Sequence, residues 1–237
     1  VITSYGLLTN GFTLTTTVTC PPQTVLDGKT FKNIEGEATG TIDLQQAFVE
    51  SCNTAFVQMA QKLTPAQLTK AAETFGFNTR EALGVPSSGG SFPAMKDIVD
   101  QAGASIGQAE VVVSPLHMAS VAAAVASGAW HQPTLLASDQ ATATVTPLDQ
   151  DAAASLRTIM GLVVTSGTAT AAQLPGTPVS GKTGTAEFGT GNPPQTHAWF
   201  IGFRGQLAFA VIVEGGGVGG LVAAPLAAKF LSMVPAG

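Results

Sequence analysis

Two short motifs hold the side chains that could do chemistry. Ser51-Cys52-Asn53 offers a hydroxyl and an amide, and Lys182-Thr183-Gly184 followed by Thr185 offers an ammonium and two hydroxyls. Acyl transfer by a serine enzyme needs an activated nucleophile, donors for the developing oxyanion and a positive group for a substrate carboxylate. The lysine motif lies at the start of an expected strand, where it can supply the positive group and one oxyanion donor. The two motifs therefore indicate an acyl-transfer site.

The strand geometry assigns a role to each residue of the lysine motif. The Lys182 ammonium can attract a carboxylate, and the hydroxyls of Thr183 and Thr185 can bind it because residues two apart share a face of a strand. Gly184 has no side chain to obstruct a closely approaching substrate. The backbone N–H of Thr185 can donate to an oxyanion, and an extended peptide can pair along the strand edge. The alternative is a solvated strand start.

The serine motif lies at an expected break between two helices. There the Ser51 hydroxyl can relay a proton between amines, and the Asn53 amide can hold a substrate carbonyl and orient a lysine. The alternative is an ordinary helix junction in which Asn53 is the N-cap of the second helix.

The elements that must position these motifs are predicted from periodicity, capping residues and turn residues. Helices are expected at the following places: residues 1–10, stopped by Gly11; 41–51, capped by Thr41; 53–62; 64–76, with a capping box of Thr64 and Gln67; 114–128, opened by Ser114-Pro115; 146–165, opened by Thr146-Pro147; and 223–233. Strands are expected at residues 12–20, 179–188, 197–204 and 207–214, with loops at 24–40 and 78–92 and a turn at 215–220. This order predicts an α/β (α+β) domain over residues 1–237, an antiparallel sheet flanked by helices.

Composition excludes several classes of function. The net charge is −5 and the charges are scattered, so we expect no nucleic-acid partner. No apolar run is long enough to span a bilayer. His117, His131 and His197 match no metal-ligand spacing, so we expect them to bind no metal. Cys20 and Cys52 are either two buried thiols or, in an exported protein, a disulfide.

The order of the motifs resembles that in penicillin-binding proteins and serine β-lactamases. The residues around these motifs resemble the penicillin-binding proteins, most of all the class B transpeptidases. Ser51-Cys52-Asn53-Thr54-Ala55-Phe56 looks like the family's second motif with the helix after it. Residues 107–110 and 114–119 look like its "GQG…TPLQMA" segment, and residues 197–203 look like the strand after K-T-G-T. The resemblance extends over nearly the whole chain.

This resemblance implies a serine DD-transpeptidase/β-lactamase-like fold and a peptidoglycan D-Ala-D-Ala transpeptidase that acts through an acyl-serine intermediate. Ser51, Asn53 and Lys182 would be catalytic, and Thr183, Gly184 and Thr185 would bind substrate. The implied partners are peptidoglycan stem peptides, β-lactam antibiotics as inhibitors, and a membrane glycosyltransferase. The resemblance implies no metal and no organic cofactor. The implied location is the extracytoplasmic face of the cell membrane, with an anchor outside this chain.

One family motif is absent: no lysine has a serine three residues before it, so the S-x-x-K nucleophile and base are missing. Val1-Ile2-Thr3-Ser4-Tyr5 resembles the family's residues directly after "STFK", so we expect that the nucleophile segment precedes Val1 and completes the sheet. Two alternatives remain open. A serine β-lactamase shares the motifs, although no E-x-x-L-N deacylation motif occurs here. A non-catalytic β-lactam sensor or scaffold would also lack S-x-x-K.

Overall fold

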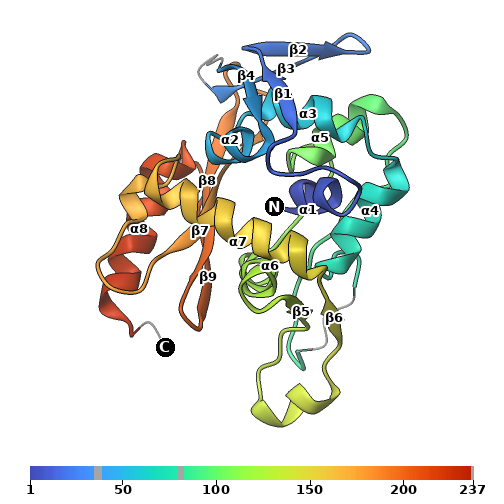
Figure 1. The fold of residues 1–237 in the computed structure, drawn as a ribbon. Coiled ribbons are helices and arrows are strands. Elements are labelled where there is room, and N and C mark those ends of the chain that lie inside the picture. Colours follow the sequence, from blue (N-terminus) through green and yellow to red (C-terminus); the bar gives the residue numbers. More distant parts are fainter. Residues whose placement is uncertain (35–38, 80–82, 236–237) are drawn as a thin grey trace.

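A computed structural model describes residues 1–34, 39–79 and 83–235 of the chain. Its centre is an antiparallel sheet of β7 (Ser180–Phe188), β8 (Gln195–Arg204) and β9 (Leu207–Val213), in the order β7-β8-β9 (Figure 1). The tight turn between β8 and β9 agrees with the expected hairpin, and Thr185 pairs with Ala198 in the register. Among the described strands, β7 therefore has β8 on one side and a free edge on the other.

Helices cover both faces of this sheet. α8 (Gly219–Met233) packs on one face, whereas α6 (Pro115–Ser127) and α7 (Gln150–Thr165) pack on the other (Figure 1). The start of α6 was predicted correctly, because the Ser114 side chain accepts a hydrogen bond from the His117 N–H. Its end was also correct, since Gly128 takes the left-handed conformation at φ 85°.

The other half of the domain consists of short helices. These are α1 (Ile2–Leu8), α2 (Leu44–Val49), α3 (Asn53–Ala60), α4 (Pro65–Thr74) and α5 (Ile98–Ser105). The capping box at the start of α4 is confirmed, because Thr64 and Gln67 each bind the other's backbone N–H. One large hydrophobic core joins this half to the sheet and includes Phe48, Phe75 and Phe200, all almost fully buried.

Three two-stranded ribbons complete the fold. β1 (Thr17–Cys20) pairs with β4 (Gly40–Asp43), and β2 (Gln23–Leu26) pairs with β3 (Lys29–Lys32) at one end of the molecule (Figure 1). β5 (Ala129–His131) pairs with β6 (Val145–Pro147) at the base of an arm at the other end. Short 3-10 helices lie at Ala137–Thr142 and Thr170–Ala172.

Several expected boundaries were wrong. The expected loop at residues 24–40 contains β3 and most of β2, while residues 35–38 and 80–82 of the expected loops lie outside the described residues. Thr41 belongs to β4, so Asp43 caps α2 instead. Thr146 and Pro147 belong to β6, and Asp149 caps α7.

Other elements are shorter or longer than expected from the sequence, or were not expected at all. The strand expected at residues 12–20 is only β1, which begins at Thr17, and α8 begins within the glycine run, at Gly219, before the expected residue 223. α5 was not anticipated. This helix has only eight residues, IVDQAGAS, and its start depends on Asp97, whose side chain accepts from two backbone N–H groups.

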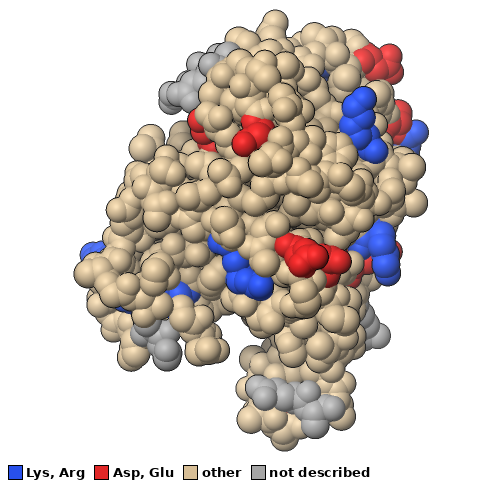
Figure 2. All heavy atoms as spheres, viewed as in Figure 1, with Lys and Arg blue, Asp and Glu red and all other residues tan. Residues whose placement is uncertain are grey.

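The surface carries few charges. On the face in Figure 2, lysines, arginines and acidic residues are scattered among uncharged side chains, with no large patch of one sign. Within the described residues, no helix combines the length and apolar character that crossing a bilayer requires.

Candidate active site

The structure brings the two motifs into contact. The Lys182 Nζ atom donates a hydrogen bond to the Ser51 Oγ atom at 2.7 Å, although 131 residues separate them in the sequence. Lys182 is on β7, and Ser51 lies between α2 and α3, as expected. Ser51 takes a left-handed conformation with φ 61°, which is uncommon for a residue with a side chain. Such strain persists only where the surroundings hold the residue in place.

A disulfide holds this junction on one side. Cys52, the middle residue of the serine motif, is bonded to Cys20 at the end of β1, and their Cα atoms are 6.2 Å apart. The interpretation of the two cysteines as buried thiols is therefore wrong. Cys52 is also the N-cap of α3, so Asn53 is the first residue of that helix and not its cap. The motif is thus tied to the β1–β4 ribbon.

A hydrogen-bond network from the β2–β3 region holds the junction on another side. The Asn33 Oδ1 atom accepts from the Thr54 N–H at 3.0 Å, and the Asn33 Nδ2 atom donates to the Pro21 carbonyl at 3.0 Å. The Thr54 hydroxyl donates to the same carbonyl at 2.7 Å. The Asn53 Nδ2 atom donates to the Lys32 carbonyl at 3.3 Å, so the amide of the motif is bonded to β3.

Burial weakens the basicity of Lys182. Its ammonium is enclosed between the two halves of the domain, 5.6 Å from the centroid of the Phe48 ring. Burial lowers the pKa of Lys182 to about 7, because an enclosed charge loses its hydration. Among the described residues, no carboxylate forms an ion pair with it. The ammonium can therefore pair with an anionic ligand, and it can exchange a proton near neutral pH.

The two threonines of the lysine motif lie on the opposite face of β7 from the Lys182 side chain, as the alternation of a strand requires. The Thr183 and Thr168 Oγ1 atoms are 2.6 Å apart. The Thr185 Oγ1 atom accepts from the Gly219 N–H at 3.3 Å, at the start of α8. A hydroxyl that accepts a hydrogen bond still has its own proton to donate. Thr185 can therefore donate to a ligand at this edge.

Two glycines allow α8 to approach β7 this closely. A side chain at Gly219 would overlap the Gly184 carbonyl, and one at Gly220 would overlap the Thr168 carbonyl. At Gly184, an added Cβ would lie 3.2 Å from the Cβ of Trp199 on the neighbouring strand. The absence of a side chain at Gly184 thus serves packing within the sheet as well as access to the strand.

The start of the chain reaches the same place. The backbone nitrogen of Val1, just before α1, is buried near the charge of Lys182. The first residue of the chain, Ser51 and Lys182 therefore converge where the two halves of the domain meet.

The sequence motifs did not identify every residue of the site. Thr168, Gly219 and the carbonyl of Lys32 each bind a motif residue, and Gln108 donates from Nε2 to the Thr185 carbonyl at 3.4 Å. Gln108 belongs to the stretch that resembles "GQG", so its involvement could have been anticipated. Thr168 carried no signal in the sequence, and Gly219 was expected only as part of a turn.

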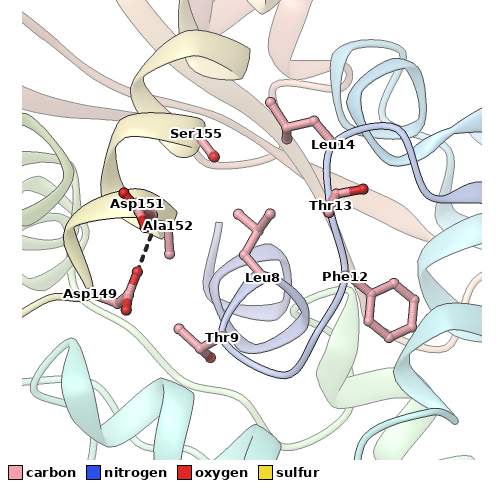
Figure 3. A pocket seen from close by; sticks show the side chains of 9 residues that line it. All are labelled: Leu8, Thr9, Phe12, Thr13, Leu14, Asp149, Asp151, Ala152 and Ser155. Atoms are coloured by element: carbon pink, nitrogen blue, oxygen red, sulfur yellow. Dashed lines mark hydrogen bonds between the residues drawn. The ribbon is translucent and has the colours of Figure 1, made fainter.

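Two surface pockets lie elsewhere. One of ≈350 Å³ is lined by Leu8, Phe12, Asp149 and Ser155, among others, beside the start of α7 (Figure 3). Its polar groups are partly engaged, since the Asp149 carboxylate caps that helix through the Ala152 N–H. Another of ≈420 Å³ lies between α1 and α4. No residue of the two motifs lines either pocket, so neither bears on the chemistry expected from the sequence.

His197 lies on β8 beside the lysine motif, where it pairs with Ala186 and stacks on Phe188. Within the described residues no three His, Cys, Asp or Glu side chains gather as a metal site would require. His117 is buried against Phe77, and its Nε2 atom has no hydrogen-bond partner among the described residues. Burial lowers the pKa of His117 to about 4.

The chain is similar to known proteins over nearly its whole length. The model of the family "Penicillin binding protein transpeptidase domain" matches residues 1–232. The peptidoglycan D,D-transpeptidase PbpA of Mycolicibacterium smegmatis is 35% identical over 255 residues, covering 95% of this chain and 52% of the relative. The chain thus spans about half the length of this curated relative.

Solved structures agree in fold. The ceftriaxone acyl-enzyme complex of penicillin-binding protein A from M. tuberculosis superposes with a TM-score of 0.88 at 29% identity, covering 98% of this chain and 58% of that one. The D,D-transpeptidase domain of a peptidoglycan glycosyltransferase from Eggerthella lenta gives 0.85 at 25% identity, covering 98% and 62%. The predicted fold class, an antiparallel sheet flanked by helices in the transpeptidase fold, is confirmed.

Proposed function

Because the chain belongs to the penicillin-binding protein transpeptidase domain family, we propose that it forms most of the site of a peptidoglycan D-Ala-D-Ala transpeptidase. The observation that carries this proposal is the 2.7 Å hydrogen bond between Lys182 and Ser51, which joins the two motifs at the free edge of β7. Its substrates would be stem peptides, and β-lactams would inhibit it by acylating the nucleophilic serine of the complete protein, which is not Ser51.

In the proposed reaction, a serine hydroxyl attacks the carbonyl of the penultimate D-Ala and an ester forms. The terminal D-Ala leaves as its amine takes a proton, and an amine of a second stem peptide then attacks the ester to form the cross-link. Ser51 and Lys182 would relay the proton to the leaving amine, which is supported by their contact and by the pKa of Lys182 near 7. Asn53 would orient the substrate carbonyl.

The binding roles belong to β7. The hydroxyls of Thr183 and Thr185 would hold the terminal carboxylate of the donor, and Lys182, whose Nζ atom reaches the strand edge at the Thr183 carbonyl, would attract it by its charge. The Thr185 N–H would donate to the oxyanion, which is supported by the position of its carbonyl. That carbonyl is bonded to Gln108, outside the sheet, and in an antiparallel ladder the N–H and C=O of one residue point to the same side. Gly184 would let the donor approach the strand.

Neither a nucleophile nor a base of the S-x-x-K type is among the 237 residues. We propose that both act beside Val1, from residues outside this sequence. The position of Val1 next to Lys182 supports this proposal. The disulfide supports an oxidising location outside the cytoplasm, and a membrane anchor would also lie outside the chain. Since cross-linking acts on newly made glycan, a membrane glycosyltransferase is the proposed partner.

The test is to incubate the complete protein that contains this chain with a fluorescent penicillin and with a D-Ala-D-Ala stem peptide. We expect a stable covalent adduct with the former and release of D-Ala from the latter. Rapid turnover of nitrocefin would favour a β-lactamase instead. Reversible β-lactam binding with no adduct and no D-Ala release would favour the non-catalytic sensor.

A further inference from the structure

The free edge of β7 is covered by side chains at the lysine motif. Along an antiparallel edge strand, alternate residues point their carbonyls outward, and such unpaired groups attract other strands. The Thr183 carbonyl accepts from Lys182 Nζ at 3.2 Å, and the Thr185 carbonyl accepts from Gln108 Nε2 at 3.4 Å. The edge along which a donor would bind is therefore already hydrogen-bonded in the free protein.

The backbone around Gln108 is fixed by the turn between α5 and α6. Gly107 and Ala109, on either side of it, are left-handed with φ 75° and 60°. The Gln108 N–H donates to the Gly103 carbonyl at 2.9 Å, and the Gly107 N–H donates to the Ala104 carbonyl at 3.0 Å. The strained conformation of Ala109 indicates a turn that its surroundings enforce. Gln108 is thus held in reach of β7, and only its half-buried side chain needs to rotate away.

A donor bound along this edge must compete with Gln108. If the carbonyl of the penultimate D-Ala accepts from the Thr185 N–H, the N–H of that same D-Ala lies opposite the Thr185 carbonyl, because an antiparallel hydrogen-bonded pair exchanges both bonds. The Gln108 amide occupies that acceptor. At 3.4 Å its bond is longer than the usual 2.7–3.2 Å, so exchange for a better-placed N–H is favourable.

We propose that Gln108 is a specificity-determining residue that holds the Thr185 carbonyl until an acyl donor supplies an N–H in its place. This inference rests on the proposed transpeptidase function. A donor with an acylamido N–H at this point exchanges one hydrogen bond for another and must displace Gln108. A donor without that N–H leaves Gln108 where it is. Gln108 therefore affects the two kinds of donor differently.

The experiment compares acylation of the complete protein by two β-lactams. Benzylpenicillin has an acylamido N–H that matches that of D-Ala, whereas a carbapenem such as imipenem has a hydroxyethyl group there. In Gln108→Ala, we expect the second-order acylation constant for benzylpenicillin to rise about fivefold, the worth of one neutral hydrogen bond, and that for imipenem to stay within about twofold. Gln61→Ala is the matched control, because Gln61 donates to its own helix at the Val57 carbonyl.

A ratio of the two constants that is unchanged or falls in Gln108→Ala would overturn the proposal, and an equal loss with both lactams would mean a structural role. A wild-type protein that neither lactam acylates would instead contradict the proposed function.

In that case, the role of Gln108 is tested by NMR of its side-chain amide in the same protein. An acyl-D-Ala-D-Ala peptide should shift these signals, and the analogue methylated on the penultimate D-Ala nitrogen should not. Equal responses to the two peptides would refute the inference.

Discussion

The Nζ atom of Lys182 lies 2.7 Å from the Oγ atom of Ser51, and the surroundings of this pair include Val1, just before α1. Among the described residues, no carboxylate pairs with the lysine. A cation bonded to a hydroxyl, without such a counter-ion, can both attract an anion and pass on a proton. The response of the protein to substitution and to pH should therefore depend on this pair and on the elements that hold it.

Removal of the charge at position 182 should abolish most donor binding without unfolding the protein. In Lys182→Met, the side chain keeps its length but cannot pair with a carboxylate. We expect acylation of the complete protein by a fluorescent penicillin to slow tenfold to a hundredfold, which corresponds to about 1.5–3 kcal/mol for one charge-assisted contact. Lys70→Met, on α4, is the control. Unchanged acylation would exclude the proposed role of Lys182.

Acylation should weaken as pH rises through neutrality. Burial lowers the pKa of Lys182 to about 7, so the ammonium of the free protein is present below that pH and lost above it. We expect the second-order acylation constant to fall toward tenfold per pH unit above about 7. In Lys182→Arg, the guanidinium stays charged, so the fall of the acylation constant above pH 7 (the alkaline limb of the pH profile) should disappear even if the rate is lower. A limb that persists in the arginine variant belongs to another group.

Loss of the disulfide should destabilise the domain and disturb the serine motif together. Cys20 and Cys52 are 32 residues apart. A disulfide that closes a loop of that length lowers the conformational entropy of the unfolded chain, which stabilises the folded state by about 3–4 kcal/mol. In the double variant Cys20→Ala/Cys52→Ala, we expect the free energy of unfolding in urea to fall by about that amount and acylation to slow. Wild-type protein treated with a reductant should behave like the variant. Coincident urea curves for all three would contradict this expectation.

Mild acid should destabilise the protein through His117. The unfolded histidine binds a proton near pH 6.5, whereas burial lowers the native pKa to about 4. The unfolded state therefore holds more protons between these values, and stability is lost as pH falls from about 6.5 to about 4. The loss amounts to about 3 kcal/mol. His117→Gln should flatten this dependence, and His131→Gln, at an exposed position, should not.

The 237 residues alone should form no stable covalent adduct with penicillin. An acyl-enzyme needs a hydroxyl activated by a neighbouring base, and the proposed role of Ser51 is to relay protons. Mass spectrometry of the chain after incubation with penicillin provides the measurement, and the complete protein provides the positive control. An adduct on Ser51 would reverse the assignment of roles.

Local signals in the sequence were reliable where they act through neighbouring residues. The capping box of Thr64 and Gln67, the start of α6 at Ser114 and its end at Gly128 were all predicted, because each depends on a few backbone groups close in the chain. The strand that contains Lys182 and the helix break at Ser51 were predicted for the same reason. These two elements hold the lysine motif and the serine motif.

Contacts between distant segments could not be predicted in this way. β2 and β3 were missed for a different reason. Asp27-Gly28 between them, both with positive φ, is a two-residue hairpin turn, and this local signal was overlooked when the stretch was interpreted as a loop. Thr168 reaches Thr183 only because the chain folds back after α7. Pairing of the cysteines was likewise undecided, since spacing does not reveal whether two thiols meet.

The disulfide also has a consequence for sequence variation. Because Cys52 stands between Ser51 and Asn53, a single substitution at Cys20 would leave a lone thiol inside the serine motif, where it is open to oxidation or mispairing. A change at either position is thus more harmful alone than together with the other. Positions 20 and 52 should therefore covary among homologues, both cysteine or both replaced, while Ser51 and Asn53 stay the same.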